Sequence, residues 1–191
     1  MLTKRQTEII NSAMDIVVNQ GTHKLTIRNV ASAIGVSEPA VYRHFASKHD
    51  LLVMLLQTLQ ESIVPIFSQA EMQSSKFTEF THTFLKTLFS HIEDNPAFAL
   101  FVFTEEAFHT DEELRPQLSH MLDSMVDKIT QLIVRFQQNG TCREDISALG
   151  IARIILGVIR LHVTQWHLKH SDSLTEQAKP LADTINKLLT T

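Results

Sequence analysis

The stretch Thr26–Lys48, TIRNVASAIGVSEPAVYRHFASK, carries the signals for two short helices joined by a tight turn. Thr26 is a candidate N-cap, and an apolar face at helical spacing follows it: Ile27, Val30, Ala31 and Ile34. Gly35 comes where a helix C-terminus favours a left-handed residue. Ser37 then predicts a second N-cap, and Pro39 falls in the first turn of the new helix, where its missing N–H costs nothing.

Two such helices bury little surface by themselves, so we expect them to pack as one unit. We assign Ile34, Val41 and Phe45 to its core, and we expect Ser47 to cap the next helix. A unit of this kind can place its second helix in the DNA major groove. It can equally be a helical hairpin with no ligand, and the spacing alone leaves both interpretations open.

The run ASAIGVSEPAVYRHFASKHDLL closely resembles the DNA-binding signature of the TetR/AcrR family of bacterial transcriptional regulators. The resemblance covers about residues 4 to 55, and its matching residues are Ala31, Gly35, Val36, Ser37, Tyr42, His44, Phe45, Lys48, Leu51 and Leu52. It implies an all-α fold of about nine helices. Residues 1–48 would form a three-helix, helix-turn-helix DNA-binding domain, and residues 49–191 a helical ligand-binding and dimerisation domain.

The resemblance implies DNA contacts for nine residues. Four residues at the start of the second helix of the unit would face base edges: Ser37, Glu38, Pro39 and Ala40. Those that would contact phosphates or the groove edge are Thr26, Arg28, Tyr42, His44 and Lys48. Pro39 departs from the family pattern, because it offers neither a backbone donor nor a polar side chain. Glu38 would therefore accept a hydrogen bond from a cytosine amine, or it would only stabilise the helix N-terminus.

Composition favours a packed all-α protein. Hydrophobic residues make up 43% of the 191, Gly and Pro number five each, and β-branched runs of period two are absent. The single cysteine, Cys142, excludes an internal disulfide and fits a reducing cytosol. No apolar leader follows Met1, and no apolar run reaches the roughly 18 residues of a membrane span. We therefore expect a cytoplasmic protein that makes no contact with a membrane.

The charge is unevenly distributed along the chain. The net charge is −4, which by itself argues against DNA binding. Residues 1–50, however, hold six Lys or Arg against four Asp or Glu, a balance of +2, whereas residues 51–191 carry −6. This asymmetry indicates that the N-terminal part meets phosphate, and that a dimer would double a modest attraction.

Apolar periodicity predicts seven further helices outside this unit. Their approximate ranges are 4–19, 48–68, 76–92, 97–108, 112–138, 145–169 and 174–189, of which the first packs on the helix-turn-helix. Pro65 predicts a kink or an early stop in the helix over 48–68, and residues 69–75 read as a loop. The resemblance implies that the helix over 48–68 transmits a ligand-induced shift; a plain connecting helix fits the sequence equally well.

The last two predicted helices favour a homodimer. The helix at about 145–169 is apolar nearly all round, with Gly157 in its middle, which predicts burial on several sides. The helix at about 174–189 carries a coiled-coil-like seam: Leu174, Ala178, Leu181, Ile185 and Leu188. Together they suggest a four-helix interface between two subunits. The alternative is a monomer that buries both helices internally.

Phenylalanines are concentrated in the body, with eight of the 11 between Phe77 and Phe108. Most must be core, but the family resemblance implies a cavity there for a hydrophobic or aromatic small molecule. Our candidate lining residues are Phe84, Phe98, Phe101 and Phe103, with Arg160 for an anionic group. Glu105 and Glu106 would instead suit a cation. The Glu105–Glu106 pair and the Arg153–Arg160 pair are each more often surface or interface charges.

No motif predicts catalysis, a cofactor or a metal. The ten histidines include His167 and His170 one turn apart, but no spacing matches a zinc pattern. Nucleophile elbows, phosphate loops and HExxH are absent. The family resemblance implies a regulator instead, most simply a repressor that releases a palindromic operator when it binds its ligand. The alternatives are a DNA-binding protein without an effector and a small all-α enzyme.

Overall fold

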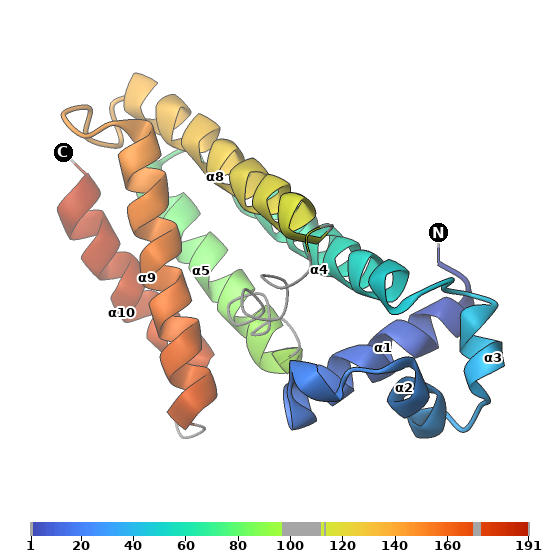
Figure 1. The fold of residues 1–191 in the computed structure, drawn as a ribbon. Coiled ribbons are helices and arrows are strands. Elements are labelled where there is room, and N and C mark those ends of the chain that lie inside the picture. Colours follow the sequence, from blue (N-terminus) through green and yellow to red (C-terminus); the bar gives the residue numbers. More distant parts are fainter. Residues whose placement is uncertain (1, 97–111, 113, 170–172, 191) are drawn as a thin grey trace. The chain divides into compact units, whose positions relative to one another are not determined.

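The computed structural model describes residues 2–96, 112, 114–169 and 173–190, and every regular element among them is helical. The elements are α1 (Lys4–Gln20), the 3₁₀ turn η1 (Thr22–Lys24), α2 (Ile27–Ala33), α3 (Glu38–Tyr42), α4 (Lys48–Met72), α5 (Phe77–Asp94), α8 (Leu114–Gln138), α9 (Ala148–Lys169) and α10 (Leu174–Leu189) (Figure 1). These bounds confirm the all-α prediction. The helix predicted at about 97–108 lies outside the described residues.

Helix α4 corrects one prediction. The early stop at Pro65 does not occur, and the helix does not end at Ser68. Helix α4 continues to Met72 and includes part of the predicted loop at 69–75. Residues on both sides of the proline are buried, including Leu59 before it and Ile66 and Phe67 after it. Burial of these flanking side chains offsets the hydrogen bond that the proline removes.

The chain divides into two compact units. The first contains residues 1–61 and 96–118, and in its described part α1, α2 and α3 form the core together with the first half of α4. Its fully buried side chains include Ile9, Ala13, Val30, Val41 and Leu51. Thr3 and Gln6 form the predicted capping box at the start of α1. The helix-turn-helix thus rests on the apolar stripe of α1.

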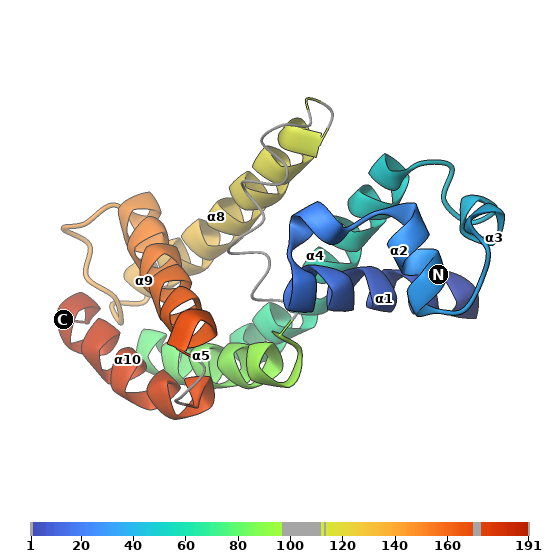
Figure 2. The ribbon, with the colours of Figure 1, turned by 60° about the horizontal axis from the view of Figure 1, so that its bottom comes forward.

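The second unit contains residues 62–95 and 119–191. Within it α10 packs along α5, as Figure 2 shows. The predicted seam of α10 lies mostly inside this contact: Leu174, Ala178, Leu181 and Ile185 are buried, and only Leu188 is exposed. Most of the seam that suggested an intersubunit coiled coil therefore packs within a single chain.

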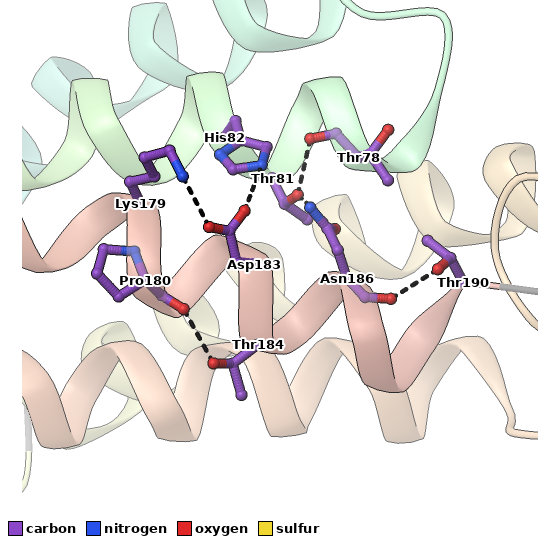
Figure 3. A network of polar contacts seen from close by, with 9 residues as sticks. All are labelled: Thr78, Thr81, His82, Lys179, Pro180, Asp183, Thr184, Asn186 and Thr190. Atoms are coloured by element: carbon purple, nitrogen blue, oxygen red, sulfur yellow. Dashed lines mark hydrogen bonds and ion pairs between the residues drawn. The ribbon is translucent and has the colours of Figure 1, made fainter.

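Polar contacts tie α5 to α10 along one side of that pair (Figure 3). The Thr81 hydroxyl lies 2.7 Å from the Asn186 carbonyl oxygen, and both residues are buried. Nearer the solvent, Asp183 accepts from Lys179 at 2.9 Å and lies 3.1 Å from His82. The Lys179 hydrogen bond lowers the pKa of Asp183, with smaller help from the nearby positive charges. These contacts fix the register of α10 on α5.

Helix α9 is less buried than its sequence predicts. One side packs inward, with Ile151, Ile155 and Val163 buried, but Ile154, Leu161 and Leu168 are 48%, 54% and 69% exposed. By length and composition alone, α4 and α9 are both apolar enough to cross a membrane, a test that core helices of soluble proteins also pass. In one chain, α9 thus leaves a large apolar surface uncovered.

Candidate DNA-binding interface

The turn between α2 and α3 is built by local hydrogen bonds. The Thr26 hydroxyl accepts from the Asn29 amide at 3.1 Å, which confirms the predicted cap of α2. Gly35 has φ +68°, in the left-handed region, and its amide donates to the Ser32 carbonyl. The Val36 amide then donates to the Ala31 carbonyl at 2.9 Å, which closes the helix end. The chain is thereby turned into α3 within four residues.

Helix α3 is held by its inner side and exposes its outer side. Val41 and Phe45 are 0% and 3% exposed, which confirms both as core, whereas Ile34 is only half-buried. Of the nine residues predicted to contact DNA, Ala40 is half-buried and eight are exposed: Thr26, Arg28, Ser37, Glu38, Pro39, Tyr42, His44 and Lys48. A short helix with an anchored inner side and a polar outer side has the form that enters a major groove.

Ser37 differs from its prediction. It occupies the N-cap position of α3 with extended backbone angles, but its side chain makes no cap hydrogen bond. Capping therefore does not use this exposed hydroxyl, and a base edge or a phosphate is a chemically suitable partner for it. Glu38, at the first position of α3, lies where a carboxylate stabilises a helix N-terminus. The two roles considered for Glu38 both remain compatible with this position.

Lys48 begins the 25-residue helix α4. The Ser47 hydroxyl accepts from the Asp50 amide at 3.0 Å, so this N-terminus is capped as predicted. Leu51, one turn further on, is fully buried and fixes the start of the helix. The exposed Lys48 ammonium therefore projects from a rigid helix end, where the first backbone N–H groups also favour an anion.

Two contacts in this unit were not predicted from the sequence. The Asn29 side-chain amide donates to the Lys24 carbonyl at 2.7 Å and so ties η1 to the first turn of α2. Arg5 forms an ion pair with Glu8 at 2.6 Å, so its charge is partly neutralised within α1. The first contact has no clear signal in the sequence, whereas the i, i+3 spacing of Arg5 and Glu8 could have predicted the ion pair.

The candidate effector residues are not brought together among the described residues. Phe84 is 2% exposed, and its ring stacks on that of Phe80 with the two centroids 5.3 Å apart. The ring of Phe67 from α4 lies tilted against Phe84, with the centroids 4.5 Å apart. Arg160 is exposed on α9, whereas Phe98, Phe101 and Phe103 lie outside the described residues. Phe84 is therefore part of an aromatic core in the second unit, and Arg160 lies at its surface.

A groove of about 670 Å³ runs between α9 and α10. Its lining is mixed, with the apolar Val158 and Trp166 beside the polar His162 and Glu176. Across the described part of the chain, no group of three His, Cys, Asp or Glu side chains lies close enough to hold a metal ion.

Two family models together match nearly the whole chain. Residues 9–55 match the model of bacterial regulatory proteins of the tetR family, which covers the helix-turn-helix described above. Residues 56–190 match the C-terminal region of YsiA-like proteins. The chain belongs to the TetR family. It is a DNA-binding transcriptional regulator, and the named relatives that share its fold are regulators rather than enzymes.

Named members of the family resemble this TetR-family chain at low identity. The transcriptional activator FasR of Mycolicibacterium smegmatis is 23% identical over 173 residues, which are 91% of this chain and 78% of FasR. The nucleoid occlusion factor SlmA of a Marinomonas species is 23% identical over 189 residues, 95% of this chain and 94% of SlmA. The two relatives have different named roles, so the family alone does not assign one.

A solved structure shares the fold. FadR of Bacillus subtilis, solved in complex with stearoyl-CoA, superimposes with a TM-score of 0.79 at 19% identity, over 94% of this chain and 96% of FadR. The likeness extends over both units of this TetR-family chain and confirms its architecture.

Proposed function

We propose that this TetR-family regulator binds a palindromic operator as a homodimer and represses transcription until an effector releases it. The exposed polar row on α3, held from behind by Val41 and Phe45, is the observation that carries the DNA assignment. Ser37, Glu38, Pro39 and Ala40 would face base edges. The phosphate and groove-edge contacts would come from Thr26, Arg28, Tyr42, His44 and Lys48. Two α3 helices about 34 Å apart would read successive major grooves.

The homodimer would form through α9 and α10, within residues 145–169 and 174–189. Ile154, Leu161 and Leu168 give α9 an exposed apolar face that a second copy would cover. Gly157 lies on the same helix, and an added Cβ there would meet no atom within 4 Å. A second helix could therefore approach α9 closely at this residue. Since most of the α10 seam is buried against α5, α10 would contribute its outer side, including Leu188.

The effector would be a hydrophobic small molecule bound in the body of the protein. We assign residues 1–48 to DNA binding and residues 49–191 to effector binding and dimerisation. The candidate effector contacts are Phe84, Phe98, Phe101 and Phe103, with Arg160 for an anionic group. The stearoyl-CoA in the related FadR supports a long-chain acyl thioester as the first compound to test. Family membership supports a cytoplasmic location.

A second candidate function is DNA binding without a small-molecule effector. Its support is the full-length similarity to SlmA, whose name describes nucleoid occlusion rather than control of metabolism. In this case the aromatic groups around Phe84 would be core alone, and acyl thioesters would leave the affinity for DNA unchanged.

Operator release separates the two candidates. The experiment measures fluorescence anisotropy of a labelled operator duplex, obtained by selection, with the dimer at half-saturation. Addition of stearoyl-CoA should lower the anisotropy with a saturable midpoint, and free CoA and stearate are the controls for each half of the molecule. Release by stearoyl-CoA alone supports the acyl-responsive repressor. Unchanged anisotropy with all three compounds rejects this effector class and favours the effector-independent protein.

A further inference from the structure

The 3₁₀ turn η1 is fixed on the first unit by contacts on both sides of its last residue. The Lys24 amide donates to the Gly21 carbonyl at 3.1 Å, and the Lys24 carbonyl accepts from the Asn29 side-chain amide at 2.7 Å. Leu25, the next residue along the chain, is 2% exposed and anchors the turn in the core of the unit. The backbone of Lys24 is therefore held in one place, although its side chain is exposed.

Helix α2 does not need the Asn29 side chain for its own cap. The Thr26 hydroxyl accepts from the backbone amide of Asn29 at 3.1 Å, and this bond completes the cap. The side-chain amide of Asn29 instead reaches back to η1, five residues earlier in the chain. Its effect is on the position of Lys24 rather than on the start of α2.

The segment around η1 carries positive charge without acidic neighbours in sequence. Residues 16–37 contain no Asp or Glu, although the chain has 21 of them. Lys24 and Arg28 are both exposed, and neither forms an ion pair or a side-chain hydrogen bond with the described residues. Arg5, by contrast, is paired with Glu8 at 2.6 Å. Lys24 and Arg28 can therefore bind an anion without first breaking an internal pair.

We propose that Lys24 binds a phosphate of the DNA backbone and that Asn29 is its positioning residue. Thr26 has extended backbone angles, and two extended residues span about 7 Å. The long side chain of Lys24 thus extends the contact surface of Thr26 and Arg28 to a further phosphate. Such a contact carries no sequence information and instead fixes the register of the unit on the duplex. The inference deepens the proposed function and rests on it, because a phosphate contact matters only if the unit binds DNA.

The salt dependence of DNA binding tests the phosphate contact in the full-length protein. Fluorescence anisotropy gives the affinity for a selected operator duplex and for a duplex of scrambled sequence, from about 50 to 200 mM salt. Lys24→Ala should lower the slope of log affinity against log salt by about 1.8, because a dimer loses two phosphate contacts, and Lys24→Arg should keep the wild-type slope. Lys86→Ala is the control and should also keep it, since it removes an exposed lysine from α5 in the second unit. An unchanged slope in Lys24→Ala overturns the proposal.

A double-mutant cycle tests the positioning role of Asn29. Asn29→Ala keeps every charge and the Thr26 cap but releases the Lys24 carbonyl, so it should weaken binding to the operator about fivefold. In the Lys24→Ala background the same substitution should have no further effect, because the side chain that Asn29 positions is gone. Equal losses in the two backgrounds would mean that Asn29 supports only the fold of the unit, and they overturn the positioning role. Urea unfolding establishes that each variant is folded under the conditions of the binding assay.

Lys48 separates a failed contact from a failed function. If Lys48→Ala lowers the slope on the operator and Lys24→Ala does not, the proposed function stands and the η1 contact is rejected. If Lys24→Ala lowers the slope on both duplexes while the wild type binds them with equal affinity, the η1 contact stands and the reading of an operator fails. Absence of binding to either duplex at about 50 mM salt overturns both.

Discussion

Replacement of Lys48 by alanine should weaken DNA binding without weakening the fold. Lys48 is exposed at the first residue of α4, next to the partial positive charge that a helix carries at its N-terminus. A cation is unfavourable there in the free protein and favourable only when an anion lies between it and the helix end. We therefore expect the free energy of unfolding of Lys48→Ala to stay constant or to rise by about 0.3 kcal/mol.

The size of the DNA effect follows from counterion release. Each phosphate neutralised on B-DNA contributes about 0.9 to the slope of log affinity against log salt concentration. A dimer presents Lys48 twice, so the variant should lose about 1.8 from the slope. Over a fourfold rise in salt, the wild type should therefore lose about twelvefold more affinity than Lys48→Ala does.

The assay is anisotropy of an operator duplex at four or more salt concentrations. Arg5→Ala is the matched control, because it also removes one cation per chain from the same unit, but a cation already paired with Glu8. The slope of Arg5→Ala should stay close to that of the wild type, and Lys48→Arg should restore the slope lost in Lys48→Ala. Equal slopes for Lys48→Ala and the wild type would refute the assignment of Lys48 to a phosphate.

Three further predictions concern stability. Glu93 accepts hydrogen bonds from the amide and hydroxyl of Thr175, and the hydroxyl contributes most to the lowered pKa of its carboxyl group. The stability that ionised Glu93 adds is present above the usual carboxyl pKa of about 4.5, and it is lost as the pH falls through the lower pKa of the folded state. Between about pH 5 and 3, the melting temperature should therefore fall less for Glu93→Gln than for the wild type. Thr81→Val should cost about 1–3 kcal/mol in urea unfolding, because it leaves the buried Asn186 oxygen without that donor; a cost below about 0.5 kcal/mol would contradict this. Thr26→Ala should cost about 1 kcal/mol and Thr26→Ser almost nothing, and equal urea midpoints for the two would contradict the capping role of the hydroxyl.

Local signals made the DNA-binding unit predictable. The Thr26 cap, the left-handed Gly35 and the early Pro39 each depend on residues within one turn, so the sequence contains all the information needed. The cap at Ser37 was the exception, because an N-cap position does not oblige the hydroxyl to bond to the backbone. The exposure of Tyr42 and Lys48 also followed from the pattern, since Val41 and Phe45 fill the inner side.

The sequence did not predict which helix would cover each apolar face in the second unit. A seam such as Leu174–Leu188 shows that a helix needs an apolar partner, but not whether that partner lies in the same chain, and α5 covers most of it. The extension of α4 beyond Ser68 to Met72 was missed for a related reason. Propensity predicts an interruption, whereas burial on both sides of the proline, which involves residues distant in sequence, keeps α4 helical. The sequence predicted that Phe84 is buried but not whether it lines a cavity, because an aromatic core and a cavity wall have the same composition.

Selection from random duplex DNA with the purified protein, at low and stated salt, tests the central claim most directly. The account predicts enrichment of a palindrome whose half-sites lie about one helical turn apart, since two copies of α3 must reach successive major grooves. Substitution of Lys48 should then weaken binding evenly across the selected sequences, and substitution of Glu38 or Ser37 should change which sequences are selected. Recovery of no preferred sequence, or of a site without two-fold symmetry, would contradict a dimer that reads DNA through α3.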